Sequence, residues 1–213
     1  MLCYKAFVSI DPTMAPWISS LVWTDYRLAV LLTVLVPLGL LASAFIKQNQ
    51  PIAALMVIYW RVSSLLAISA YLLIAAMPVG FVTGWLARLL IVIALWFWVD
   101  INESLEEQAS NPLRFSLLSW RWAVSAYCLI GAIAQLPVLR CAFLPSVAVL
   151  DPISEPLCYL WMQPPFGFKE MFHPTTTAWF LGGIGLVGLG AYGLYLAYFL
   201  LVRFNKRKRS ALG

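Results

Sequence analysis

Charged side chains are scarce in this chain of 213 residues: 11% are Asp, Glu, Lys or Arg, whereas 62% are hydrophobic. An ordinary soluble domain is about 45–50% apolar and about 25% charged. With a mean hydropathy of +0.86, the chain has more apolar surface than a soluble core of this size can bury. The composition excludes an ordinary soluble protein and predicts a polytopic membrane protein.

The polar breaks between the long apolar runs are short, and none of them resembles a domain linker. A helix needs roughly 20 apolar residues to cross a bilayer, and the chain supplies several such runs. We therefore predict an all-α polytopic membrane helix bundle with about five transmembrane helices in one membrane domain, 28–202. The predicted spans are 28–46, 53–78, 81–99, 120–139 and 178–202.

Asp, Glu, Lys and His are missing from the predicted spans, and the arginines within them are Arg61, Arg88 and, at a span end, Arg121. None of the nine Asp and Glu residues lies within a span, and Asp25 and Asp100 lie at span edges. Proton- and ion-coupled carriers usually place such groups inside the membrane, so this absence argues against a proton pump. The single histidine, His173, has no second His or Cys-rich spacing near it. A hydrogen-bonded interfacial role is therefore expected for it, and no metal or cofactor is predicted.

Catalytic motifs are also absent, with no G-x-S-x-G, H-E-x-x-H or phosphate-binding glycine loop in the sequence. The segment between the third and fourth predicted spans carries four acids that would share one face of a short helix. A solvated docking face is favoured over a divalent-metal site there, and we predict that the protein is not an enzyme. The four acids are Asp100, Glu103, Glu106 and Glu107.

Basic residues are distributed unequally between the two ends of the predicted bundle. By the positive-inside rule, the richer end is cytoplasmic. This places a basic tail, 203–213, in the cytoplasm, and puts the N-terminal segment, 1–27, and the loop 140–177 on the external or lumenal side. The richer end has Lys47, Arg114, Arg121, Arg203, Lys206, Arg207, Lys208 and Arg209, and the other has Lys5, Arg27, Arg140 and Lys169.

Cysteine is rare, but two of the four cysteines share the external loop. Cys141 and Cys158 would lie in a compartment where disulfides persist, so a disulfide between them is predicted. A bridge closing a loop of this length stabilises a fold by about 3 kcal/mol in the chain-entropy description. The alternative is two unrelated thiols that act as small buried hydrophobes. The prolines of the loop predict a segment without regular secondary structure, and its aromatic residues predict that it lies against the membrane surface or caps the bundle.

Two arginines lie within predicted spans, and a third follows a tryptophan at a span end. Arg61, Arg88 and Arg121 each have a tryptophan nearby in sequence, a pairing typical of the headgroup level. They are predicted as interface anchors, with a site for lipid headgroups or for a partner's carboxylate as the functional alternative. Pairing of Asp25 or Asp100 with an arginine is a further possibility that the sequence leaves open.

Glycine is concentrated in the last predicted span. Small residues allow helix backbones to approach closely in a membrane. A packing face is therefore predicted, and a helix of the same chain is slightly favoured over another subunit as its partner. The predicted face consists of Gly182, Gly183, Gly190, Gly193 and Ala197.

Six stretches resemble a known family. The chain is similar to a cyanobacterial family of multi-pass membrane proteins known as domain of unknown function 3177. The resemblance implies a cyanobacterial origin and brings no assigned activity or catalytic residue. Its members tend to begin shortly before LVWTDYR, which makes Met14 a candidate start and 1–13 an upstream extension. The stretches are LVWTDYRLAV (21–30), YWRVSSLLAISAYL (59–72), LWFWVDINE (95–103), WRWAVSAYC (120–128), LRCAF (139–143) and LYLAYF (194–199).

These observations favour an integral membrane protein without catalytic activity. We expect an accessory, assembly or stabilising partner of a larger cyanobacterial membrane complex in the thylakoid or plasma membrane. The alternative is a small permease or channel for an uncharged or lipid-like solute. The expected partners are membrane lipids and a membrane-protein complex, with no nucleic acid.

Overall fold

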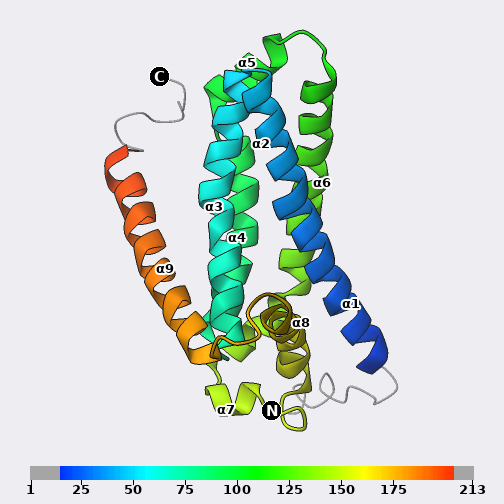
Figure 1. Ribbon diagram of the computed structural model, residues 1–213, viewed down its shortest axis with the longest axis vertical. Helices are drawn as coiled ribbons and strands as arrows, with labels where there is room; N and C mark the ends of the chain where they lie inside the picture. The colour runs from blue at the N-terminus through cyan, green and yellow to red at the C-terminus, as the bar shows by residue number, and fades with distance from the viewer. Residues whose placement is uncertain (1–14, 204–213) are drawn as a thin grey trace, which may run out of the picture.

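A computed structural model describes residues 15–203 of the chain. Within this range there are only helices and their connections, with no strand. Five helices are long and apolar enough to cross a membrane, which confirms the predicted all-α polytopic bundle (Figure 1). They are Trp17–Ile46, Gln50–Ile74, Val79–Trp96, Pro112–Ala134 and Ala178–Val202.

The first spanning helix is longer than the sequence predicted. It consists of α1 (Ala15–Ala29), a π-helical stretch η2 (Val30–Leu35) and α2 (Val36–Ile46). The expected start at residue 28 is wrong, as is the assignment of all of 1–27 to a segment outside the span. Asp25 was interpreted as an edge residue, but it is paired inside the bundle and so does not end the span.

The π-helical stretch ends beside Pro37, which has no N–H to donate to the preceding turn. Side chains from two other helices bond to carbonyls of that turn. The Tyr59 hydroxyl donates to the Thr33 carbonyl at 2.8 Å, and Trp120 Nε1 donates to the Leu32 carbonyl at 2.7 Å. In a membrane, neighbouring helices must satisfy backbone groups that proline leaves free, and these two bonds do so.

Three further spans and a short connecting helix complete the main bundle. These are α3 (Gln50–Ile74), α4 (Val79–Trp96), α5 (Val99–Glu107) and α6 (Pro112–Ala134). Side-chain oxygens of Asn49 and Asn111 accept bonds from the first turns of α3 and α6, as expected of helix N-caps. The fourth span thus begins earlier than the predicted residue 120, because Asn111 and Pro112 start the helix.

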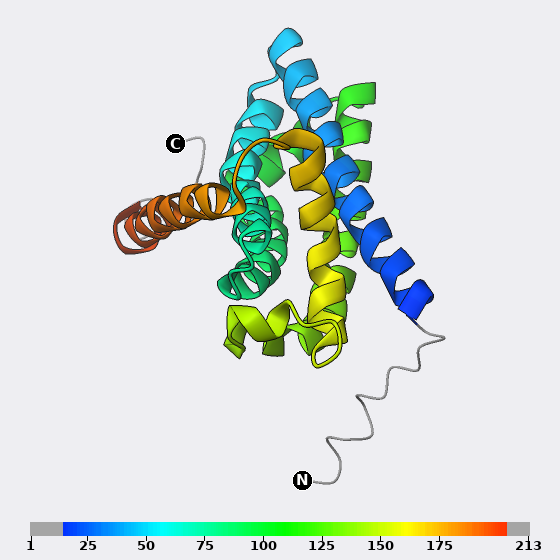
Figure 2. The same ribbon diagram turned by 60° about the horizontal axis from the view of Figure 1, so that its bottom comes forward.

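The segment 140–177 is largely helical, which corrects the expectation of a loop without regular structure. It includes the end of η3 (Leu136–Phe143), all of α7 (Ser146–Val149) and all of α8 (Pro156–Phe172). Pro156 lies in the first turn of α8, where a missing N–H costs nothing. Helix α8 lies across one end of the bundle beside α1, and its length is visible in Figure 2. It therefore caps this end of the bundle.

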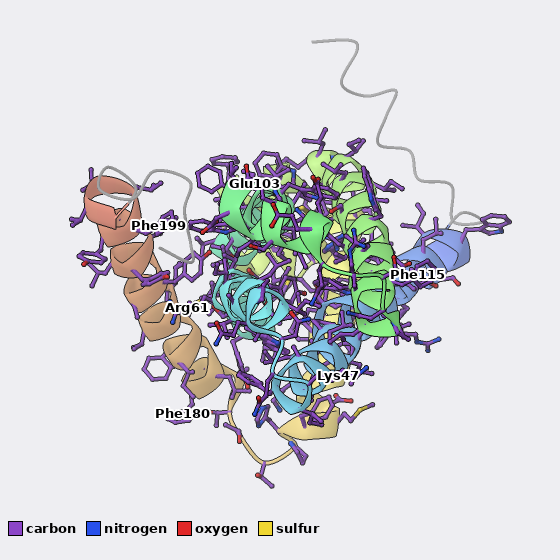
Figure 3. All side chains as sticks on the ribbon, turned by 90° about the horizontal axis from the view of Figure 1, so that it is seen from above. Lys47, Arg61, Glu103, Phe115, Phe180 and Phe199 are labelled. Atoms are coloured by element: carbon purple, nitrogen blue, oxygen red, sulfur yellow. A yellow bond between two sulfur atoms is a disulfide. The ribbon has the colours of Figure 1, made fainter. Side chains whose placement is uncertain are left out.

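The last span, α9 (Ala178–Tyr198), continues into the π-helical turn η4 (Phe199–Arg203). Helix α9 packs on α3 at the end near α8 and diverges from the bundle toward the other end (Figure 1). The view along the bundle in Figure 3 shows α9 standing to one side of the other spans. At the far end of α9, the Phe199 ring of η4 contacts the Trp98 ring at a centroid distance of 5.9 Å.

The described interior contains two separate apolar clusters. The first includes Tyr59, Leu117 and Ile91 and fills the part of the bundle toward α5. The second includes Phe81 and Trp161 and lies beneath α8. The residues between the two clusters on α1, α4 and α6 are polar or small, and they form the site described next.

Candidate functional site

An ion pair between a buried arginine and a half-buried aspartate joins the first and third spanning helices. Arg88 of α4 donates from Nη2 to Oδ2 of Asp25 in α1. The Tyr127 hydroxyl of α6 lies 2.9 Å from Oδ1 and also 2.9 Å from the main-chain oxygen of Asp25. The Arg88 guanidinium carbon lies 5.1 Å from the centroid of the Tyr127 ring. Three helices thus meet at one charged, hydrogen-bonded cluster inside the membrane span.

Gly131 of α6 makes room for the arginine. A Cβ atom at this position would lie 2.8 Å from Arg88 Cζ and would overlap Nη1. The glycine therefore allows the guanidinium to lie between α4 and α6. Any larger residue at position 131 would displace either the arginine or the helix.

Arg88 is not the headgroup-level anchor that the sequence predicted. Its side chain is only 6% exposed and lies between the two apolar clusters. A charge at this depth is costly unless it is paired, and the carboxylate of Asp25 supplies the pair. The sequence left open which acid would meet which arginine, because the partners are 63 positions apart.

Arg121 is also buried, so its prediction as a lipid or partner contact is wrong. Its guanidinium carbon lies 3.9 Å from the centroid of the Trp96 ring, and Nη2 donates to Asn102 Oδ1 at 2.7 Å. Trp96 in turn donates to the Ser125 hydroxyl at 2.9 Å. Arg121 therefore holds the junction between α4, α5 and α6.

Arg61 remains available for contact with lipid or a partner. It is exposed on α3, on the side that faces α9 in Figure 3. Its role as an interface anchor stays a prediction.

One cavity opens between α1 and α6 and extends to η3 and α8. Its volume is about 1010 Å³, and its lining includes Asp25, Tyr127, Gly131 and Trp161. Most of the other lining residues are aliphatic. Exposed residues such as Ile130 mark its opening at the flank of the bundle.

A second cavity of about 760 Å³ lies on the other side of α1, between α1, α3, α4 and α8. It is richer in polar and aromatic side chains than the first. Both Asp25 and Arg88 line it, and Asp25 and Trp161 line both cavities. The charged cluster therefore lies where the two cavities approach each other.

Two hydrogen-bonded pairs line the second cavity or lie beside it. The Tyr71 hydroxyl lies 3.1 Å from Nε2 of His173, at the α8 end. Deeper in the bundle, the Ser69 hydroxyl lies 2.9 Å from that of Thr83 and also donates to the Leu65 carbonyl. His173 is thus hydrogen-bonded near the end of the bundle, as the sequence predicted.

The predicted disulfide between Cys141 and Cys158 is present, with a Cα–Cα distance of 5.8 Å. It joins η3 to α8, and both residues are fully buried. Arg140 forms an ion pair with Glu155 at 2.9 Å directly beside the bridge. Because α8 carries Trp161, the disulfide also fixes one wall of both cavities.

The predicted glycine face of α9 coincides only in part with the observed contact. Gly182, Gly185 and Gly188 face Ala75, Leu72 and Ile68 of α3 or of the turn that follows it. Of the five predicted residues, Gly182 alone belongs to this contact. Nothing lies within 4 Å of a Cβ atom built at Gly183, Gly190 or Gly193, and Ala197 is exposed.

The acidic residues of α5 do not form a metal site with other ligands. Within residues 15–203, no group of three or more His, Cys, Asp or Glu side chains is arranged to hold a metal ion. Glu103, Glu106 and Glu107 are exposed, and the Asp100 carboxylate accepts a bond from the Ile101 N–H. The basic residues Lys206, Arg207, Lys208 and Arg209, and the candidate start Met14, lie outside the described residues.

Comparison with known proteins identifies a family for the chain. A family model described as "Protein of unknown function (DUF3177)" matches residues 19–212. No curated protein and no solved structure matches the chain.

Proposed function

The chain belongs to the DUF3177 family of proteins of unknown function, and we propose that it is a non-catalytic accessory, assembly or stabilising partner of a larger membrane complex. The observation that supports this role is the position of α9. In its most apolar stretch 6% of the residues are buried, against 22–39% in the other four spans.

The uncovered side of α9 suits a neighbouring helix. The side that packs on α3 uses Gly182, Gly185 and Gly188, whereas Gly183, Gly190 and Gly193 have open space around them. Helices in a membrane associate through close packing of small residues, because lipid tails are as apolar as the side chains. We place a helix of another subunit against this uncovered side.

We further propose that the end carrying α5 is cytoplasmic and the end carrying α8 external or lumenal. Arg27, Arg114 and Arg121 lie inside spanning helices, so the charge comparison depends on the residues beyond the helix ends. These are Lys47 and the basic tail at one end, against Lys5, Arg140 and Lys169 at the other. This asymmetry supports the orientation through the positive-inside rule. A cyanobacterial thylakoid or plasma membrane is the proposed location, from the family resemblance.

A permease for an uncharged or lipid-like solute is supported less well. The two cavities offer a binding space, but both lie toward the α8 end. Toward α5, the described interior is filled by buried side chains such as Leu55, Ile101 and Leu117. A solute route would have to open through this apolar cluster.

Site-specific photocrosslinking tests the partner role. A photoreactive amino acid at Val187, on the uncovered side of α9, is expected to give one discrete adduct in native membranes. Phe115 on α6 is a matched control, since the two residues are 76% and 73% exposed. Mass spectrometry of the adduct should identify a single membrane subunit, present in stoichiometric amount after purification in mild detergent.

The test depends on whether the adduct forms at Val187 on α9 and not at Phe115 on α6. Equal adducts from Val187 and Phe115, or adducts with lipid alone from both, would contradict a partner on α9.

Cysteine labelling with a membrane-impermeant reagent in intact spheroplasts tests the orientation separately for a plasma-membrane location. A tail that reacts from outside would overturn the proposed topology.

A further inference from the structure

We propose that Arg61 of α3 pairs with a carboxylate on a spanning helix of the partner complex, a helix that carries an Asp or Glu near the middle of its membrane span. This inference rests on the partner role proposed above and names the chemistry of one contact. The contact lies on α3 and is separate from the one proposed for the uncovered side of α9.

Arg61 lies at mid-depth in the membrane. It is close to the centre of the 25-residue helix α3 (Gln50–Ile74), which at about 1.5 Å per residue is about 37 Å long. The hydrocarbon region of a bilayer is about 30 Å thick. The neighbouring Tyr59 bonds to the Thr33 carbonyl, and Thr33 is near the middle of the first span. Both comparisons place Arg61 far from either membrane surface.

Arg61 is on the face of α3 that meets α9. On this face, Leu72 and Ile68 lie against glycines of α9, and Arg61 precedes Ile68 by two helical turns. Helix α9 has diverged from α3 at this level (Figure 1), and Arg61 is exposed on the side toward α9 (Figure 3). The divergence of α9 thus leaves the arginine uncovered.

The Arg61 guanidinium has no acidic partner among residues 15–203. The ion pairs of this range involve Arg88 and Arg140, and the Ser64 hydroxyl bonds only to the main-chain oxygen of Arg61. A charge at mid-depth is costly in lipid unless a counter-charge compensates it. The structure therefore leaves room for an anion that another molecule brings to Arg61.

Helix α9 itself cannot neutralise this arginine. The span Ala178–Val202 contains no charged side chain, so closing α9 on α3 along its whole length would cover Arg61 without compensating it. A helix that packs beside Arg61 has to bring an acid. Ser64 and Ala67, on the following turns of α3, are small and exposed, which allows such a helix to approach closely.

Depth favours a carboxylate over a lipid phosphate. Phosphates lie at the headgroup level, outside the hydrocarbon region. Arginine extends toward them where it can, but the distance of more than about 15 Å from Arg61 to either end of α3 exceeds the length of its side chain. A carboxylate on a spanning helix can lie at the depth of Arg61 and accept two parallel hydrogen bonds from the guanidinium.

A synthetic spanning peptide tests the contact with the full-length protein in phosphatidylcholine vesicles. The peptide consists of leucine and alanine with lysines at both ends and one glutamate at its centre, and the matched control peptide has glutamine there. Energy transfer between a fluorophore on the peptide and one at the protein C-terminus measures association. The glutamate peptide is expected to bind about three- to tenfold more tightly, a difference typical of polar contacts between membrane helices.

Three variants assign the preference to Arg61. Arg61→Leu should abolish it, whereas Arg61→Lys should retain part of it, because lysine keeps the charge but lacks the planar fork of donors. Arg27→Leu is the control and should leave the preference unchanged. Arg27 is also exposed, but it is adjacent to Tyr26, which packs on Phe168 at the α8 end.

The stability of the isolated protein gives a second readout. Because no acid of the described chain pairs with Arg61, Arg61→Leu should not lower the thermal unfolding midpoint in detergent. A lower midpoint would show that Arg61 is paired within its own chain, and the proposal would be overturned.

Equal binding of the two peptides would overturn the proposal, as would a preference that survives Arg61→Leu. Loss of the preference when phosphatidylglycerol is added to the vesicles would assign Arg61 to a lipid headgroup and overturn it as well. The crosslink at Val187 reports on α9 alone, so failure of the Arg61 contact is distinguishable from failure of the proposed partner role.

Discussion

Arg88 and Asp25 form an ion pair inside the membrane-spanning bundle, where neither charge could remain alone. Breaking a buried pair by removing one partner costs about 3–5 kcal/mol, because the other charge is left uncompensated. Replacing both by apolar residues is often close to neutral.

Asp25→Ala is therefore expected to lower the thermal stability of the purified protein strongly, and the double variant Asp25→Leu/Arg88→Met to restore most of it. Thermal unfolding in one detergent gives the comparison. Thr24→Ala is a control, since Thr24 is exposed and its hydroxyl bonds only within its own helix. A double variant as unstable as Asp25→Ala would refute the ion-pair explanation.

Gly131 tests the same cluster from α6. A methyl group there would overlap Arg88, so Gly131→Ala should destabilise the protein by about 1–3 kcal/mol, as overpacking does. Gly39→Ala is the matched control, because nothing lies within 4 Å of a Cβ atom at position 39. Similar stabilities for the two variants would show that Arg88 has room to move.

The bond from Tyr59 to the Thr33 carbonyl predicts a third effect. Tyr59→Phe keeps the ring packed against Trp120, at a centroid distance of 5.0 Å, but removes the hydroxyl. A buried carbonyl beside Pro37 then loses its partner, at a cost of about 1–3 kcal/mol. Tyr198→Phe, in an exposed position, should leave the unfolding temperature unchanged. Equal unfolding temperatures for wild type and Tyr59→Phe would show that this bond does not stabilise the π-helical turn.

Hydropathy predicted the number and approximate place of the spans, because partition into lipid depends on local composition. The pairing of charged residues, unlike the position of a span, does not follow from local composition. Asp25 was assigned to a span edge because it precedes the predicted start at residue 28, and Arg88 was assigned to the headgroup level because Trp85 lies nearby in sequence. The ion pair depends on a contact between segments that are distant in the chain, and a single sequence does not reveal such a contact.

In the segment 140–177 the prolines led to a wrong prediction of secondary structure. Pro152 and Pro156 were interpreted as helix breakers, but Pro156 begins α8 and Pro164 and Pro165 lie inside it. The disulfide was predicted because both cysteines share one compartment, which is a property of topology rather than of local structure. The glycine face of α9 was wrong in detail, since the partner helix and its crossing point select which small residues are used.

The disulfide should stabilise α8 without affecting membrane insertion. Cys141→Ser is expected to lower the unfolding free energy by about 3 kcal/mol, because the unfolded chain is then no longer held by the 141–158 bridge. Insertion should persist, because the apolar spans carry the partition into lipid. Peptide mapping without reductant should recover the linked peptides, with the free thiol Cys128 as the internal reference. Alkylation of both cysteines before reduction would show that packing alone holds α8.

Two glycines on α9 separate packing within the chain from packing against a partner. At Gly185 a Cβ atom would lie 3.1–3.2 Å from atoms of Leu72, whereas Gly193 has nothing within 4 Å. Gly185→Val should therefore push α9 from α3 and lower the stability of the isolated protein by about 1–3 kcal/mol. Gly193→Val should leave that stability nearly unchanged. It should reduce co-purification of the proposed partner subunit, because the added side chain keeps a neighbouring helix from packing closely on the uncovered side. Loss of stability from Gly193→Val in the isolated protein would mean that this side already packs within the chain, and the proposed contact with another subunit would then have to lie elsewhere.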